Sequence, residues 1–167
     1  LFNMGLVFYT TIRGIPQFYY GTEILMNSDE NPNSHDIIRT EFPGGWNDHD
    51  VSAITGVGLT NEQIKSQSFF KKLLNWRKTN KAIHYGKLIH FAPKEQNEIY
   101  SYFRILDDHI VWVIFNRKDE DQFIELDRFK EVVKGRRNAY DVINEKNILF
   151  EDKVKISKKS SIIFEFK

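Results

Sequence analysis

Hydrophobic residues are spaced in two ways along this chain, and the change falls near residue 86. Residues 1–11 are apolar almost all round, which is typical of a helix buried on several sides. Residues 15–20 form an apolar and aromatic run between Gly14 and Gly21, and this pattern predicts a buried strand. A helix, a strand buried on both faces and a polar loop are typical of a parallel α/β sheet, although a core strand of any α/β protein has the same pattern.

The clearest helix signal covers residues 59–80. Thr60 and Gln63 occupy the two positions of a capping box at its start. The residues that follow at helical spacing predict one core-facing stripe: Phe69, Phe70, Leu73, Leu74 and Arg77. Lys78 and Lys81 place positive charge at the end of the helix, where its dipole favours it.

From Gly86 onward the hydrophobic period is two. A helical turn is expected at 129–133, ended by Gly135. The spacing predicts strands at 87–92, 98–106, 109–116, 123–126, 139–143, 148–150, 154–156 and 161–166. Short strands about ten residues apart predict an antiparallel sandwich.

Asp107 and Asp108 are expected to form a tight turn between two of these strands. Across this hairpin Ile99, Phe103 and Ile105 can face a core, as can Val111, Val113 and Phe115.

Composition excludes several classes of function. The 167 residues are 41% hydrophobic and carry a net charge of +1, which gives no electrostatic reason to expect nucleic-acid or membrane partners. The small basic clusters at 134–137 and 158–159 are interpreted as solvated turns. The absence of cysteine excludes disulfides and thiol chemistry. The chain opens within a predicted helix without an initiator methionine, so we expect a fragment whose parent protein is periplasmic, secreted or cytoplasmic.

Two motifs, at residues 14–23 and 41–46, resemble segments of the α-amylase superfamily of glycoside hydrolases. Gly14-Ile-Pro-Gln-Phe-Tyr-Tyr-Gly-Thr-Glu23 resembles the eighth barrel strand of that superfamily. Glu41-Phe-Pro-Gly-Gly-Trp46 is similar to the loop after this strand in the neopullulanase and cyclomaltodextrinase branch, where aspartate usually stands in place of Glu41. Ile83-His-Tyr-Gly-Lys87 is similar to the passage from barrel to C-terminal sandwich. The resemblance therefore extends over essentially the whole chain.

The resemblance implies an α+β fragment in two parts. Residues 1–82 would be the last βα portion of a TIM (β/α)8 barrel, with a helix, the last strand, a loop and the last helix. Residues 83–167 would be an all-β antiparallel sandwich domain. The family's catalytic aspartate, its glutamate acid/base and a further aspartate stand on earlier strands, and their Gly-x-Arg-x-Asp and Asn-His-Asp motifs are not in this sequence. We therefore expect a retaining α-glucan hydrolase as the parent and an inactive fragment.

Arg39 and Trp46 are the candidate substrate-binding residues in the loop after the predicted strand. Arg39 would contact a sugar hydroxyl or form a structural ion pair with Glu41 or another carboxylate. Trp46 would form the wall of a sugar-binding cleft or anchor the loop. Tyr19 and Tyr20 have the same aromatic chemistry, but an ordinary core position is favoured for them.

The expected partners and cofactors follow from the same reasoning. The parent would bind α-glucan oligosaccharides or cyclodextrins, and the fragment would be prone to self-association because its apolar opening residues lack their neighbours. His35-Asp36 and Asp48-His49-Asp50 are interpreted as solvated loops, so no cofactor or metal is expected in the fragment, while a calcium requirement of the parent is left open. The alternatives are a carbohydrate-binding sandwich that uses Tyr100, Tyr102 and Trp112, or a purely structural sandwich.

Overall fold

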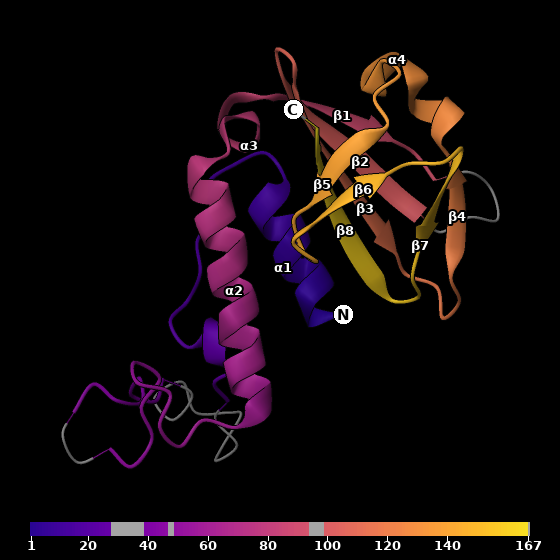
Figure 1. Ribbon diagram of the computed structural model, residues 1–167. Helices are drawn as coiled ribbons and strands as arrows, with labels where there is room; N and C mark the ends of the chain where they lie inside the picture. The colour runs from indigo at the N-terminus through magenta and orange to yellow at the C-terminus, as the bar shows by residue number, and fades with distance from the viewer. Residues whose placement is uncertain (28–38, 47–48, 94–98, 167) are drawn as a thin grey trace. The chain divides into compact units, whose positions relative to one another are not determined.

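The computed structural model describes residues 1–27, 39–46, 49–93 and 99–166 (Figure 1). The chain divides into two compact units, Leu1–Ile15 with Leu73–Lys167 and, separately, Pro16–Lys72. The first helix packs within the same unit as the sheets. Within the described residues, no helix is both long enough and apolar enough to cross a bilayer.

The larger unit contains two antiparallel sheets, which confirms the antiparallel sandwich expected from the period of two. The six-stranded sheet has the order β1-β2-β3-β8-β5-β6, and a two-stranded sheet pairs β4 with β7 (Figure 1). The strands are β1 (Lys87–Phe91), β2 (Ile99–Leu106), β3 (His109–Asn116), β4 (Gln122–Glu125), β5 (Asn138–Asp141), β6 (Lys146–Leu149), β7 (Lys153–Ile156) and β8 (Ser160–Phe166).

The core between the two sheets is aromatic and centres on Trp112, which is fully buried. The Trp112 and Phe103 rings stack with their centroids 5.2 Å apart, and the Phe129 ring lies 4.6 Å from Trp112. Ile124 of β4 and Ile156 of β7 close the core from the small sheet. Burying aromatic rings of this size is the largest single source of stabilisation in a domain of this kind.

The strand register divides the buried side chains of the β2–β3 hairpin between two faces. Leu106 pairs with His109 across the two-residue turn, so Phe103 lies opposite Trp112 on the sandwich face. Val111, Val113 and Phe115 lie on the other face of the sheet and are buried there, as expected from the sequence. Both faces of this hairpin are therefore covered.

Helices cover this second face. α1 (Phe2–Thr11) places the Phe8 ring against Tyr102 and Phe115, with centroid distances of 6.2 and 6.1 Å. The short helix α3 (Lys81–Tyr85) packs on β2 and β3. At the other end of the unit, η2 (Leu126–Phe129) and α4 (Lys130–Val133) form the helical turn expected before Gly135.

The smaller unit confirms one prediction and corrects another. α2 (Asn61–Thr79) begins at the expected capping box, in which the Thr60 amide donates to Gln63 Oε1 (2.9 Å) and the Gln63 amide donates to Thr60 Oγ1 (3.2 Å). Residues 15–20, expected to form a strand, do not pair with any strand among the described residues and lead instead into the 3-10 turn η1 (Thr22–Ile24). A strand needs a neighbour for its backbone groups, and the described part of Pro16–Lys72 contains none. The Phe18 ring packs on Phe70 of α2, 4.6 Å between centroids, and anchors the segment.

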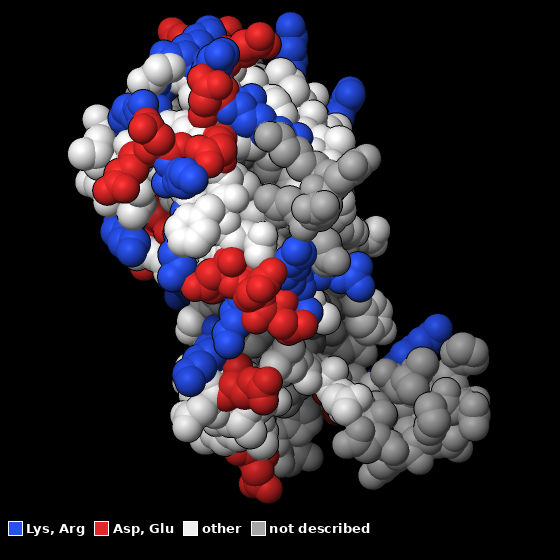
Figure 2. Space-filling view, turned by 90° about the vertical axis from the view of Figure 1, so that its right-hand side faces the viewer, with Lys and Arg blue, Asp and Glu red and all other residues white. Residues whose placement is uncertain are grey.

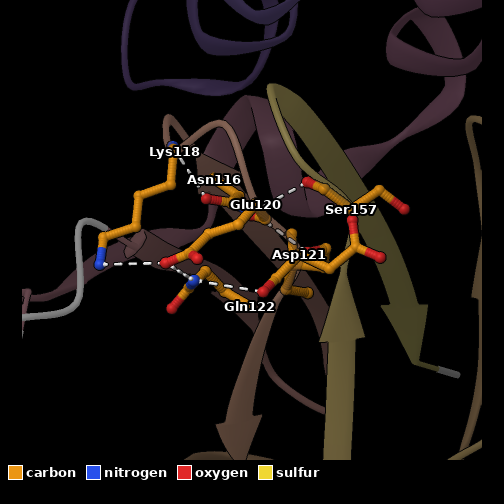
Figure 3. A network of polar contacts seen from close by, with 7 residues as sticks. Asn116, Lys118, Glu120, Asp121, Gln122 and Ser157 are labelled. Carbon is orange, nitrogen blue, oxygen red and sulfur yellow. Dashed lines mark hydrogen bonds and ion pairs between the residues drawn. The ribbon is translucent and has the colours of Figure 1, made fainter.

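Asn116 ties the ends of β3 and β7 together. Its buried side-chain amide donates to the carbonyl oxygens of Glu120, Ile156 and Ser157 at 2.9–3.1 Å, and its Oδ1 accepts from the Lys118 amide at 3.0 Å (Figure 3). The contacts therefore use both ends of the side-chain amide, and they fix the loop between the two sheets.

We expect Asn116→Asp to destabilise the protein by about 3 kcal/mol, because a carboxylate of the same shape places negative charge against buried carbonyl oxygens. The free energy of urea unfolding at neutral pH measures this loss. Asn75→Asp, at an exposed position on α2, is the matched control and should change stability by less than about 0.5 kcal/mol. Equal effects of the two substitutions would show that the Asn116 contacts contribute nothing.

Because of Tyr102, the free energy of unfolding depends on pH in the alkaline range. Burial raises the pKa of its hydroxyl well above the usual value, opposed in part by the hydrogen bond with Thr11, whose hydroxyl oxygen lies 2.5 Å away. Unfolded tyrosine ionises near pH 10, so the unfolded state loses this proton first. The contribution of Tyr102 is thus complete below about pH 10 and is lost as the pH rises from there towards the folded pKa.

Unfolding free energies measured between about pH 9 and about pH 11 should fall with a slope of up to about 1.4 kcal/mol per pH unit from this group. Tyr102→Phe should remove that part of the slope, whereas Tyr85→Phe, at a position 76% exposed, should keep it. A wild-type slope that survives in Tyr102→Phe contradicts the assignment.

Candidate functional site

The smaller unit presents two stacked tyrosines just before a tight turn. The Tyr19 and Tyr20 rings lie 4.5 Å apart at an angle of 33°, and they are 60% and 43% exposed. The core position favoured for them from the sequence is therefore wrong. Gly21 follows with φ of 83°, and a Cβ there would lie 2.5 Å from Met26 Sδ, so the turn requires glycine.

Contacts of Tyr20 hold the beginning of the following loop against this pair. The Tyr20 hydroxyl donates to the carbonyl oxygen of Thr40 at 2.9 Å. A hydrogen bond with Tyr19 raises the pKa of Tyr20, and desolvation adds to this effect, whereas the charge of nearby Arg39 opposes it. The structure therefore brings the candidate Arg39 close to the aromatic pair.

Glu41 pairs with His49, and not with Arg39 as one of the sequence interpretations had it. His49 Nε2 lies 3.5 Å from Glu41 Oε2, and His49 Nδ1 accepts a hydrogen bond from the Gly44 amide at 2.9 Å. Because Nδ1 is an acceptor, a neutral His49 carries its proton on Nε2, directed at the carboxylate. The pair fixes the loop without requiring a charged imidazole.

The loop that carries Trp46 is closed by its own backbone. The Ala53 amide donates to Pro43 O at 3.0 Å, and the Ser52 amide donates to Val57 O at 2.8 Å. Gln67 of α2 donates to Ala53 O at 2.8 Å and anchors the loop. Trp46 is 65% exposed, so its ring can contact a ligand from this loop.

Aromatic surface and hydrogen-bonding groups thus lie on the two segments expected from the sequence. The hollow beside Tyr19, Tyr20 and Thr40 measures about 130 Å³, less than the roughly 300 Å³ of an enclosing ligand pocket. These residues therefore form an open surface that suits stacking on one face of a flat ligand. His35, Asp36 and Asp48 lie outside the described residues, and within the described ones no three metal-binding side chains gather.

The aromatic residues considered for sugar binding by the sandwich have other roles. Trp112 and Tyr102 are fully buried, and Tyr100 is half-buried with its hydroxyl 2.5 Å from His90 Nδ1. Trp112 and Tyr102 consequently have no free face to offer to a ligand.

Charges of opposite sign are interleaved on the face drawn in Figure 2. Among the described residues, ion pairs join charges of opposite sign, such as Lys155 with Asp121 at 2.7 Å and Lys153 with Glu125 at 3.0 Å. The basic clusters of the sequence take part, since Arg137 pairs with Asp152 at 2.9 Å and Lys159 with Asp119 at 3.2 Å.

A larger cavity, which the sequence analysis did not anticipate, lies within the other unit. It measures about 900 Å³ and is lined from α2, β3, β5, β6 and β8 by residues that include Trp76, Asn80, His109, Tyr140 and Glu165. No local sequence pattern predicts this cavity, because its lining residues come together only through the strand register and the packing of the end of α2.

The sandwich has a recognised counterpart. Residues 88–165 match the family model described as the cyclo-malto-dextrinase C-terminal domain. This part of the chain is similar to that C-terminal domain, and the match bears out the resemblance to the α-amylase superfamily.

Solved structures share the fold over nearly the whole chain. The α-amylase from Geobacillus thermoleovorans, complexed with acarbose, is 17% identical, with a TM-score of 0.67; the match covers 98% of this chain and 32% of that one. AmyP in complex with maltose is 14% identical, with a TM-score of 0.75, and the match covers 98% of this chain and 34% of AmyP. The maltogenic α-amylase AmyB from Thermotoga neapolitana is 16% identical, with a TM-score of 0.67, and the match covers 98% of this chain and 36% of AmyB. The chain thus spans about a third of the length of these enzymes.

Proposed function

We propose that this chain is the C-terminal part of a retaining α-glucan hydrolase, similar to α-amylase and neopullulanase, that acts on α-1,4-glucosidic bonds of starch-type glucans or cyclodextrins. The match of residues 88–165 to the C-terminal domain family of cyclo-malto-dextrinases carries this proposal. The enzymes of similar fold are described as α-amylases and a maltogenic α-amylase, and two of them were crystallised with acarbose or maltose.

In this proposal residues 1–82 are the last portion of a (β/α)8 barrel, and residues 83–167 are the sandwich domain. The fold similarity covers 98% of the chain and so extends into the residues before the sandwich. In this proposal the partners of a strand at residues 15–20 would come from the rest of the barrel.

The chemistry requires groups from outside this chain. Retaining glycosidases use two carboxyl groups about 5 Å apart, one as nucleophile and one as acid and then base. The sequence motifs that hold such groups in this superfamily are not among these 167 residues. The chain alone is therefore inactive, and its exposed apolar residues, such as Leu1, Phe2 and Ile15, favour self-association.

Arg39 and Trp46 contribute to substrate binding in this proposal. The exposed indole of Trp46 offers a flat apolar surface to one face of a glucose ring. Arg39, close to Tyr20, offers guanidinium donors to sugar hydroxyls at the same loop.

The longer protein that contains this chain should hydrolyse maltotriose and cyclodextrins with release of the α-anomer, as retention requires. Proton NMR of the first products gives the anomeric configuration. The 167-residue chain by itself should release no glucose or maltose at enzymatic rates. Release of the β-anomer, or turnover by the isolated chain, contradicts the proposal.

Trp46→Ala in the longer protein should raise the KM for maltotriose roughly tenfold, because one aromatic contact with the sugar is lost, while the fold is kept. Ile54→Ala, which removes a side chain 74% exposed in the same loop, is the control and should leave KM within about twofold. If Trp46→Ala behaves like Ile54→Ala, Trp46 only anchors the loop.

A further inference from the structure

The cavity of about 900 Å³ in the larger unit has the size of a ligand site. It lies entirely among residues of Leu73–Lys167, and none of its lining residues takes part in the function proposed above. Both aromatic and planar polar side chains line it, as in sites that take a molecule with apolar faces and many hydroxyl groups.

Strand register builds the floor of this cavity. Tyr140 of β5 pairs with Glu165 of β8 and with Asn147 of β6, so the three side chains form one row on the same face of the sheet. Tyr140 is 36% exposed, and Asn147 at the end of the row is also exposed. The row therefore presents an aromatic ring flanked by an amide and a carboxylate.

The end of α2 forms the wall of the cavity. Trp76 and Thr79 belong to its last turn, and Asn80 follows as the N-cap of α3. Trp76 Nε1 donates to Glu165 Oε2 at 3.1 Å, and this bond fixes the plane of the indole next to the floor. Two aromatic side chains, Trp76 from α2 and Tyr140 from β5, thus line the cavity.

Glu165 is held rigidly between these elements although it is only 7% exposed. Its Oε1 accepts from Asn80 Nδ2 at 3.1 Å and lies 2.6 Å from His109 Nε2, while Oε2 accepts from Trp76. Three donors offset the cost of burying the carboxylate and orient the polar groups around the cavity. A preorganised set of this kind binds hydroxyl groups without a large loss of side-chain entropy.

We propose that this cavity is a binding site for a neutral oligosaccharide of a few glucose units, stacked between Trp76 and Tyr140 and hydrogen-bonded by Asn147 and His109. A negatively charged ligand is disfavoured because the Glu165 carboxylate lines the cavity. A cationic ligand is also disfavoured, because the Glu165 carboxylate already accepts hydrogen bonds from three donors. Only the choice of glucose among neutral sugars rests on the proposed function.

The three tryptophans provide the test, because each lies in a different environment. In the 1H–15N spectrum of the 167-residue chain, maltotriose should shift the indole signal of Trp76 in a saturable way. The signal of the fully buried Trp112 should stay unchanged and also reports that the fold is intact. A shift of the Trp46 signal reports binding at the loop of the other unit and is scored separately.

Tyr140→Ala should weaken the binding reported by Trp76 roughly tenfold, and Asn147→Ala, at an exposed position, should weaken it roughly threefold. Tyr85→Ala, which removes a tyrosine 76% exposed outside the cavity, is the matched control and should leave the affinity within about twofold. If Tyr140→Ala changes the Trp112 signal, and so disturbs the fold, the affinity of the Asn147→Ala variant tests the proposal instead.

Three results would overturn the proposal. The first is a Trp76 signal that maltotriose does not move at millimolar concentration. The second is a saturable shift that Tyr140→Ala and Asn147→Ala leave unchanged. The third is a response to tetramethylammonium chloride without a response to maltotriose, which would make this a cation site. These results are independent of whether the longer protein cleaves glucans, so failure here and failure of the proposed function are distinguishable.

Discussion

The arrangement of the larger unit depends on two arginines that bind the carbonyl end of α1. Arg104, 1% exposed, donates to Thr11 O at 3.1 Å and to Gly86 O at 3.0 Å. Arg77 donates to the carbonyl oxygens of Thr10 and Gly14. Burial lowers the pKa of both guanidinium groups, yet the unpaired carbonyls and the dipole at a helix C-terminus favour a cation there. The residue whose carbonyl oxygen Arg104 binds must also be a glycine, because a Cβ at Gly86 would lie 2.3 Å from the carbonyl oxygen of Ala82.

This attachment explains why the sheet is buried on both faces and why the first helix packs in the same unit as the sheets. Trp112 and Phe103 fill the sandwich side, whereas Tyr102 and Val113 meet α1 and α3 on the other. The sandwich therefore takes part of its stability from residues that precede it in sequence. A sandwich domain produced without Leu1–Ile15 would expose this second face to water, where its apolar area disfavours the monomer.

Local patterns predicted the elements of the fold, and non-local pairing decided the rest. The alternation after Gly86 and the capping box at Thr60 act over a few residues, so the sequence alone located the sandwich strands and α2. The predicted strand at 15–20 is not formed, because a strand needs a partner for its backbone groups and the described part of Pro16–Lys72 contains no other strand. The two faces of the β2–β3 hairpin follow from the two-residue turn at Asp107 and Asp108, which sets the parity of the strand pairing. Glu165, at an alternating position, has the pattern of a solvated charge, but α2 covers it.

One row of side chains connects the structural and the polar parts of the larger unit. Arg104, Val111 and Glu165 are paired across β2, β3 and β8, and Tyr140 and Asn147 continue the row through β5 and β6. The end of α1 contacts the row at Arg104, whereas Glu165, Tyr140 and Asn147 line the cavity. Apolar residues would satisfy a purely structural contact at least as well, because a buried carboxylate contributes little net stability even when it is paired. The polar half of the row is therefore better explained by a ligand than by packing.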